Sequence, residues 1–170
     1  RQRQMCIRDR SYSEDPRVIL IKLADRLEVM RSLEMFPREK WRKKSWESMN
    51  LYAQIAHKLG LYSIKSELED IALKYLEPKD YEHVVTKLEE SAEERKAFIG
   101  RFLVPIEQRL NRLGIKYHIK SRTKSIFSIW TKMHKQHVPF EGVYDIFALR
   151  IILDCPPEEE KTQCLSLIHI

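Results

Sequence analysis

Apolar residues recur at the spacing of an α-helix through much of the chain, beginning just after Pro16. The segment VILIKLADRLEVMRSL carries one apolar face, formed by Ile19, Leu23, Leu27 and Met30. Residues three and four positions apart lie on the same side of a helix, and proline is favoured in its first turn. The pattern therefore predicts a helix that starts at the proline. Because its first half is apolar on all sides, we expect it to be deeply packed.

The same spacing predicts four further helices, over residues 37–59, 64–76, 81–88 and 92–113. Gly60 follows the first of them, at a position where helices commonly end. It leaves only a short connection to the next helix. We therefore expect the first two of these helices to pack against each other as an antiparallel pair.

The spacing changes after Gly114. Residues 115–119 alternate as in a strand, and 125–135 return to helical spacing. Residues 143–153 are mostly apolar and rich in β-forming side chains, which predicts a buried strand. A run of helices is thus followed by a β-α-β unit. This order indicates an α+β fold that is mainly helical.

The composition supports a folded helical protein and excludes several classes. Of 170 residues, 43% are hydrophobic, so the chain can bury a core, and only 4 are Gly, which argues against a turn-rich all-β fold. The longest apolar runs fall far short of the roughly 20 residues that cross a bilayer, so we expect no membrane association. Cys6, Cys155 and Cys164 show no pairing pattern, which favours a cytoplasmic location.

The two ends of the chain differ from the rest. Residues 1–10 (RQRQMCIRDR) have neither strand nor helix period, and residues 164–170 (CLSLIHI) form a short apolar stretch that stops abruptly. Both resemble translated sequencing-adapter sequence, and on that interpretation they are not native to the protein. The alternative is a natural basic arm at one end and a natural edge strand at the other.

Positive charge is concentrated in one stretch. The net charge is +6, and residues 115–137 contain six Lys or Arg and no Asp or Glu. Such an excess predicts a polyanionic partner, either nucleotide phosphates or nucleic acid. A helical nucleic-acid or polyanion-binding module would contact phosphates through 115–137 without a metal, with an affinity that falls steeply with salt. A solvated basic face is the remaining interpretation.

A candidate anion site lies where the first strand passes into the following helix. Arg122 and Lys124 share strand parity, so we expect their side chains on one face. The helix starts near Ser125, and its N-terminal amides would add hydrogen-bond donors for an anion. Lys132 lies about two turns further on, while Asp145 begins the next strand, where a carboxylate can hold Mg²⁺. Cations for phosphates and a carboxylate for a metal are the minimum set for phosphoryl transfer.

A second candidate is Asp25, which interrupts the first apolar helix between Leu23 and Leu27. A buried carboxylate needs a partner. We therefore expect Asp25 to meet either a metal ion or one of the nearby cations, Arg26 and Arg31. Spacing alone leaves both interpretations open.

Four stretches carry a family resemblance: LIKLADRL, YAQIAHKLGLYSIKSELEDIALKYLEP, SRTKSIFSIWTKM and VYDIFALRIIL. They are similar to the RelA/SpoT family, the bacterial bifunctional synthetase–hydrolases of the alarmone (p)ppGpp, and the resemblance covers residues 18–153. It implies the end of an HD-type hydrolase domain over 11–36 and a central helical bundle over 37–76. It further implies the N-terminal part of a nucleotidyltransferase-like synthetase domain over 77–154, followed by a tail over 155–170.

The resemblance also implies roles for single residues. On the synthetase side, the residues that match the ATP-phosphate site are Arg122, Lys124, Ser128 and Lys132. Asp145 matches the catalytic carboxylate that holds Mg²⁺. On the hydrolase side, Asp25 matches the last Mn²⁺ ligand, whose partner ligands would lie upstream. Val29 stands where the family commonly has a nucleotide-contacting Asn, which predicts weakened hydrolysis, and His57 is interpreted as structural.

The activity implied by the resemblance belongs to a longer parent enzyme. That enzyme would transfer pyrophosphate from ATP to the 3′-hydroxyl of GTP or GDP, and the hydrolase of the family removes it from (p)ppGpp. ATP and these guanosine nucleotides are the expected partners, whereas contact with the ribosome would need C-terminal regions outside this chain. Because each half-site lacks other ligands here, we expect the chain alone to be inactive. Whether the parent synthesises, hydrolyses or does both stays open.

Overall fold

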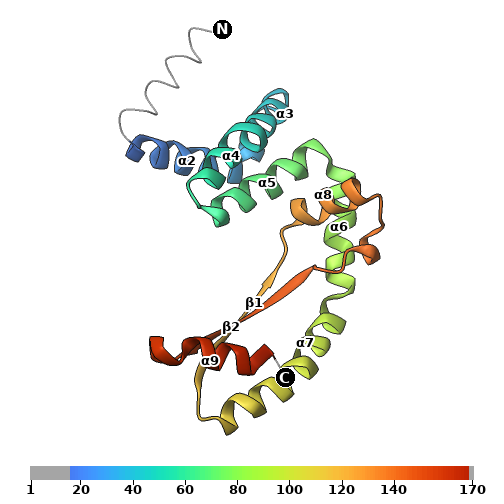
Figure 1. Cartoon of the computed structure of the whole chain (residues 1–170). Coiled ribbons are helices and arrows are strands. Elements are labelled where there is room, and N and C mark those ends of the chain that lie inside the picture. The colour runs from blue at the N-terminus through green and yellow to red at the C-terminus, as the bar shows by residue number, and fades with distance from the viewer. Residues whose placement is uncertain (1–15, 169–170) are drawn as a thin grey trace. The chain divides into compact units, whose positions relative to one another are not determined.

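The computed structural model describes residues 16–168, so the basic segment 1–10 lies outside the described residues. The chain divides into two compact units (Figure 1). Of the described residues, the first unit contains 16–82 together with Ser125–Trp130, and the second contains His83–Lys124 and 131–168. Two helices, α6 (Pro78–Glu90) and α8 (Ile126–Gln136), begin in the first unit and end in the second.

The first unit is helical. Besides the start of α6 and of α8, its elements are α2 (Pro16–Arg31), η1 (Leu33–Met35), α3 (Arg38–Glu47), η2 (Ser48–Tyr52), α4 (Ala53–Lys58) and α5 (Tyr62–Leu76). The segments α3, η2 and α4 follow one another without a break, because the residues that join them keep helical backbone angles. They confirm the predicted helix over 37–59. Its middle, η2, is a π-helical turn that the sequence pattern does not predict.

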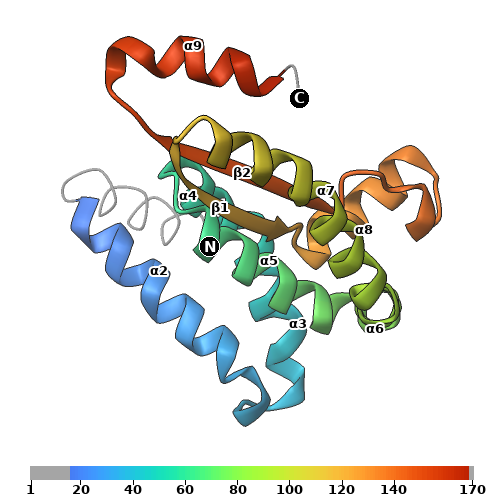
Figure 2. The ribbon, with the colours of Figure 1, turned by 90° about the horizontal axis from the view of Figure 1, so that it is seen from below.

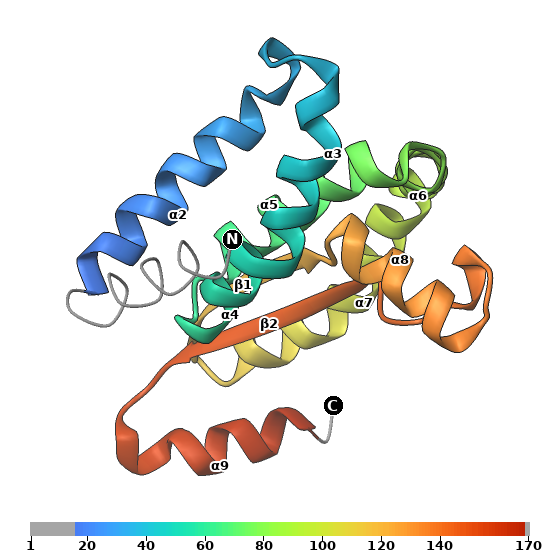
Figure 3. The ribbon, with the colours of Figure 1, turned by 90° about the horizontal axis from the view of Figure 1, so that it is seen from above.

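Helix α5 packs against α2, α3, η2 and α4. In the orientation of Figure 1, α5 lies below α3 and α4. It is therefore in front of them in Figure 2, which is seen from below, and behind them in Figure 3, which is seen from above. The continuous helix α3–η2–α4 contacts α5 at both of its ends, and only a short connection joins it to α5. The two helices therefore run antiparallel, as predicted. The buried residues between these helices form one cluster: Leu23, Leu27, Met30, Leu33, Tyr52, Ala53, Ala56, Leu68 and Ala72.

Helix α2 buries one face only. Leu23 and Met30 are 1% exposed, as its apolar stripe predicts, whereas Leu20 and Ile21 are 49% and 67% exposed. The expectation that this helix is deeply packed is therefore wrong. Apolar residues on all sides of a short segment do not by themselves show burial on all sides, because burial also needs a neighbouring segment on each face.

The second unit contains a small sheet covered by a helix. Its further elements are α7 (Ala92–Arg112), β1 (Lys116–Thr123), η3 (Phe140–Gly142), β2 (Phe147–Asp154) and α9 (Pro157–Ile168). The two strands pair antiparallel, with Lys116 opposite Asp154 and Thr123 opposite Phe147. Helix α7 lies below the strands (Figures 2 and 3), and its Phe98 ring meets Phe147 edge-on at 5.9 Å between centroids.

The β-α-β order is confirmed, but the second strand differs from the prediction. It begins at Phe147 rather than Val143, and its residues alternate between half-buried and exposed. The physical reason is that a two-stranded sheet with a helix on one side has one open face. Of the segment considered as an edge strand near the C-terminus, residues 164–168 belong to α9 and the last two lie outside the described residues. None of the helices in residues 16–168 combines the length and apolar character needed to span a bilayer.

Candidate functional site

Two lysines converge on Asp145 in the second unit. The Lys124 Nζ donates to Asp145 Oδ2 at 2.5 Å, and the Lys132 Nζ donates to the same oxygen. Three segments supply the cluster: the end of β1, the helix α8, and the turn before β2. The structure thus brings together three residues that lie up to 21 positions apart in the sequence. We refer to these three side chains as the Asp145 cluster.

The Asp145 cluster is strongly charged and open to solvent. Hydrogen bonds from Lys124 and Lys132 lower the pKa of Asp145 to about 2, and the carboxylate in turn raises the pKa of Lys132. The Asp145 side chain is 52% exposed. Asp145 is therefore ionised at neutral pH, and a competing anion or cation can reach the cluster from solvent.

The backbone around Asp145 is held by the sheet and by a tight turn. The Lys124 amide donates to the Ile146 carbonyl at 2.8 Å, which fixes the end of β1 beside the residue after Asp145. In the preceding turn, a Cβ on Gly142 would lie 2.9 Å from the Val138 Cβ, so only glycine fits there without a shift. Both features hold the turn in a defined conformation.

Arg122 is not part of the Asp145 cluster. It is exposed on the open face of the sheet, opposite Ala148, and its side chain has no hydrogen bond or ion pair within the described residues. Lys124 lies beyond the end of β1 and turns to Asp145. Arg150, which the sequence analysis missed, is exposed on the same face as Arg122 and pairs in register with Lys120. The alternation of β2 is the signal that would have placed it there.

The first turn of α8 is engaged by the chain itself. The Phe127 amide donates to Asp70 Oδ1 at 2.8 Å, and the Ile126 amide also hydrogen-bonds to Asp70. Ser128 Oγ pairs with Ser125 Oγ at 2.7 Å. The expectation that these amides would face an external anion is thus corrected: two of them already serve a carboxylate. Asp70 was missed because a contact 57 residues away leaves no local signal.

Asp25 is exposed on α2, so burial does not force a partner on it. The two nearby cations are engaged elsewhere. Arg26 pairs with Glu47 at 3.1 Å and stacks on a tyrosine ring, and Arg31 pairs with Glu67 at 2.6 Å. Among residues 16–168, no group of three or more His, Cys, Asp or Glu side chains is placed to hold a metal ion. The described residues therefore do not complete a metal site at Asp25.

The two other residues singled out on the hydrolase side lie in the same unit. His57 is exposed near the end of α4, with its ring 5.8 Å from that of Tyr62, and Val29 is half-buried on α2.

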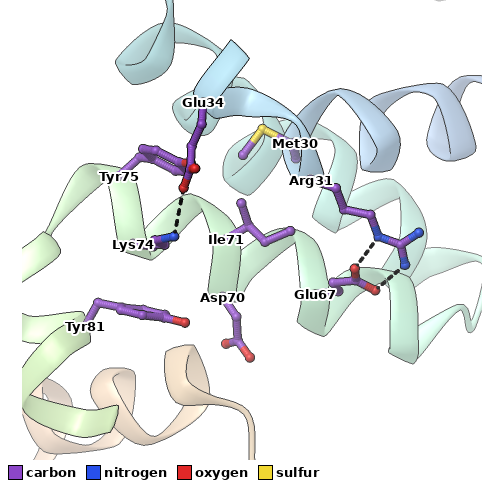
Figure 4. Close-up of a pocket in the computed structure, with 9 residues that line it drawn as sticks. All are labelled: Met30, Arg31, Glu34, Glu67, Asp70, Ile71, Lys74, Tyr75 and Tyr81. Carbon is purple, nitrogen blue, oxygen red and sulfur yellow. Dashed lines mark hydrogen bonds and ion pairs between the residues drawn. The ribbon is translucent and has the colours of Figure 1, made fainter. Parts of the chain in front are cut away.

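A pocket of about 480 Å³ opens in the first unit (Figure 4). Its charged residues are largely paired across it, since Arg31 binds Glu67 and Lys74 binds Glu34. Asp70 points away from these two pairs. Burial raises the pKa of Asp70 to about 6, although hydrogen bonds from the α8 amides oppose the shift.

Comparisons with known proteins match both parts of the chain. A profile of the HD domain matches residues 2–62, and a profile described as a region found in RelA/SpoT proteins matches residues 121–170. The second match contains the whole Asp145 cluster. Both matches extend into the terminal segments of the chain.

Curated relatives match most of the chain. A guanosine-3′,5′-bis(diphosphate) 3′-pyrophosphohydrolase of Aquifex aeolicus is 43% identical over 158 residues, or 92% of this chain. A GTP pyrophosphokinase of Streptomyces coelicolor is 38% identical over 85% of the chain, and one of Myxococcus xanthus is 35% identical over 94%. The chain spans only 22%, 17% and 21% of these relatives, about a fifth of their length. The resemblance predicted from sequence is confirmed: this chain belongs to the RelA/SpoT family.

Proposed function

We propose that this chain carries the ATP-phosphate half of a (p)ppGpp synthetase site. The observation that supports this most is the Asp145 cluster, in which two ammonium groups surround one carboxylate within the region matched by the RelA/SpoT profile. The proposed reaction of the whole protein is transfer of pyrophosphate from ATP to the 3′-hydroxyl of GTP or GDP. The polyanion-binding alternative is not favoured, because the relatives are named as nucleotide enzymes.

Each residue has a proposed task in that reaction. Lys124 and Lys132 would neutralise the phosphates of ATP, whose oxygens replace Asp145 as acceptors for their ammonium groups. Arg122, on the open sheet face, would contact the nucleotide from the strand side. Ser128 would serve mainly the helix start, since its hydroxyl is paired with Ser125. Holding the donor phosphates in line with the attacking hydroxyl is the main work of such a site.

Asp145 suits a magnesium ion. Mg²⁺ is commonly held by one or two carboxylates together with substrate phosphates, and Asp145 is ionised and half-exposed. When bound there, Mg²⁺ would neutralise charge that develops on the transferred phosphates. Proteins of both matched families generally use divalent metals.

The hydrolase activity has less support from the described residues. Asp25 stays a proposed Mn²⁺ ligand of the whole protein, but the described residues do not complete a site around it. A valine at position 29 has no side-chain hydrogen bond to offer a nucleotide. We therefore propose the synthetase half-site as the function that this chain supports best, and Val29 predicts weakened hydrolysis by the whole protein.

The test is binding of Mg·ATP to this chain by calorimetry. Lys132→Ala should weaken the affinity by about 10-fold or more, because it removes a charge-assisted phosphate contact. The exposed Lys135, on the same helix, provides a matched control of equal charge. Equal affinities for Lys132→Ala and Lys135→Ala would show that net charge, and not this site, binds the nucleotide.

A further inference from the structure

The start of α8 is capped by a side chain from another helix. Asp70 of α5 accepts hydrogen bonds from the amides of Ile126 and Phe127, the latter at 2.8 Å. Helix N-termini are usually capped by a residue directly before them, and here the local candidate, Ser125 Oγ, lies 3.4 Å from the Ser128 amide. The stronger cap therefore comes from a residue far away in the sequence.

A second carboxylate holds the next turn of the same helix. The Trp130 Nε1 donates to Asp80 Oδ2 at 2.7 Å, and the side chain of the preceding residue, Ile129, is fully buried. Helix α8 thus has its first five residues anchored within the first unit. It continues without a break to Gln136, and Lys132 lies five positions after Phe127.

The protonation of Asp70 changes near neutral pH. Burial raises its pKa to about 6, so it gains a proton in a range where other surface carboxylates stay ionised. On the same helix, Glu69 raises the pKa of Asp70 and Lys65 lowers it. Tyr81 faces Asp70 from α6. The remaining charged groups around the pocket are paired with one another (Figure 4): Arg31, Glu34, Glu67 and Lys74.

We propose that Asp70 is a positioning residue for the nucleotide site: by capping the first turn of α8, it holds the helix that carries Ser128 and Lys132. The role of α8 in binding phosphates rests on the function proposed above. The capping itself rests only on the geometry of α5 and α8. An ionised carboxylate accepts hydrogen bonds from helix amides better than a neutral acid, because the N-terminal end of a helix dipole is positive. The cap should therefore weaken as the pH falls below about 6.

The experiment compares Asp70→Ala and Asp70→Asn with Glu77→Ala, an exposed carboxylate at the end of α5 that serves as control. Two quantities are measured between pH 5.5 and 7.5. One is hydrogen exchange of the Ile126 and Phe127 amides by NMR, and the other is the affinity for Mg·ATP. Asparagine keeps the acceptor oxygen without a titrating charge, so it separates loss of the cap from loss of the carboxylate.

At pH 7.5, Asp70→Ala should speed exchange of the two amides by about fivefold, the equivalent of losing an N-cap, and should weaken Mg·ATP by up to the same factor. Asp70→Asn should restore both only in part, because the neutral amide keeps the acceptor oxygen but not the charge. The wild type should approach the behaviour of Asp70→Asn as the pH falls through 6, whereas Asp70→Asn itself should not change over this range.

Unchanged exchange and affinity in Asp70→Ala, relative to Glu77→Ala, would overturn the proposal. The same pH dependence in the wild type and in Asp70→Asn would also overturn it. If the wild type bound no Mg·ATP, the proposed function and the nucleotide part of this proposal would fall together. Exchange at Phe127 would still decide whether Asp70 caps α8.

Discussion

Lys124 Nζ lies 2.5 Å from Asp145 Oδ2, and this contact joins the end of β1 to the turn before β2. Lys132 reaches the same oxygen from α8, so one carboxylate oxygen gathers two cations from separate elements. An isolated ion pair on an exposed surface contributes little to stability. Under the proposed function, the phosphates of a nucleotide would take over these lysines.

Replacing Asp145 should separate binding from chemistry. In the whole protein, Asp145→Asn should reduce pyrophosphate transfer by at least about 100-fold, because the amide cannot hold Mg²⁺ as a carboxylate does. The affinity for ATP should stay within a few-fold of the wild type, since both lysines remain. Turnover and ATP affinity measured on the same preparation test this. Near-normal transfer would show that another group holds the metal.

The ionisation of Asp145 should not shape activity near neutral pH. Its pKa is lowered to about 2 by the two lysines, so any contribution of the Asp145 cluster is present above the ordinary carboxylate range. That contribution is lost only as the pH falls through about 2. A pH profile of Mg·ATP binding should therefore be equal for the wild type and Asp145→Asn between pH 5 and 8. A difference that develops within this range would mean that Asp145 titrates there.

Arg122 should contribute to nucleotide binding from the open sheet face. Arg122→Ala should weaken Mg·ATP by roughly 1.5–3 kcal/mol if its guanidinium makes a charge-assisted phosphate contact. Since the side chain of Arg122 has no hydrogen bond or ion pair within residues 16–168, its removal should leave the free energy of unfolding unchanged within about 0.5 kcal/mol. Calorimetry and urea denaturation measure the two effects. Weaker folding without weaker binding would contradict the assignment.

Gly142 should be required by the turn that leads to Asp145. A methyl group there would lie 2.9 Å from the Val138 Cβ, so Gly142→Ala should destabilise the protein by about 1–3 kcal/mol. Gly100 provides the control, since it lies within α7 with nothing within 4 Å of an added Cβ. Gly100→Ala should stabilise by about 0.5–1 kcal/mol. Equal changes in the urea midpoint for both variants would show that the turn adjusts to the added methyl.

Asp70 should make the folded state less stable as the pH rises. Its pKa is about 6 in the folded protein and 3.8 ordinarily, so the unfolded chain loses its proton first. Stability attributable to Asp70 is therefore full below about pH 4 and falls as the pH rises to 6, by an amount on the order of 3 kcal/mol. The difference in unfolding free energy between Asp70→Asn and the wild type should grow over this range. A constant difference between pH 4 and 7 would show that Asp70 is not shifted.

Local patterns in the sequence were enough to predict most of the helices, the order of the strands and the family. The stripe from Leu23 to Met30 and the glycine at position 60 predicted helices that the structure contains, because helical spacing and chain-ending residues are local properties. The basic residues Lys124 and Lys132, together with Asp145, also predicted a charged site. Stretches such as SRTKSIFSIWTKM carry the family resemblance in the sequence alone.

The tertiary structure decided which groups meet. Only the fold turns Lys124 toward Asp145 while leaving Arg122 on the open face, since strand parity no longer holds beyond the end of β1. Only the fold brings Asp70 to the amide of Phe127, 57 residues away. Such contacts depend on how separate helices pack, and packing is set by the sum of many weak interactions rather than by the spacing of residues along one segment.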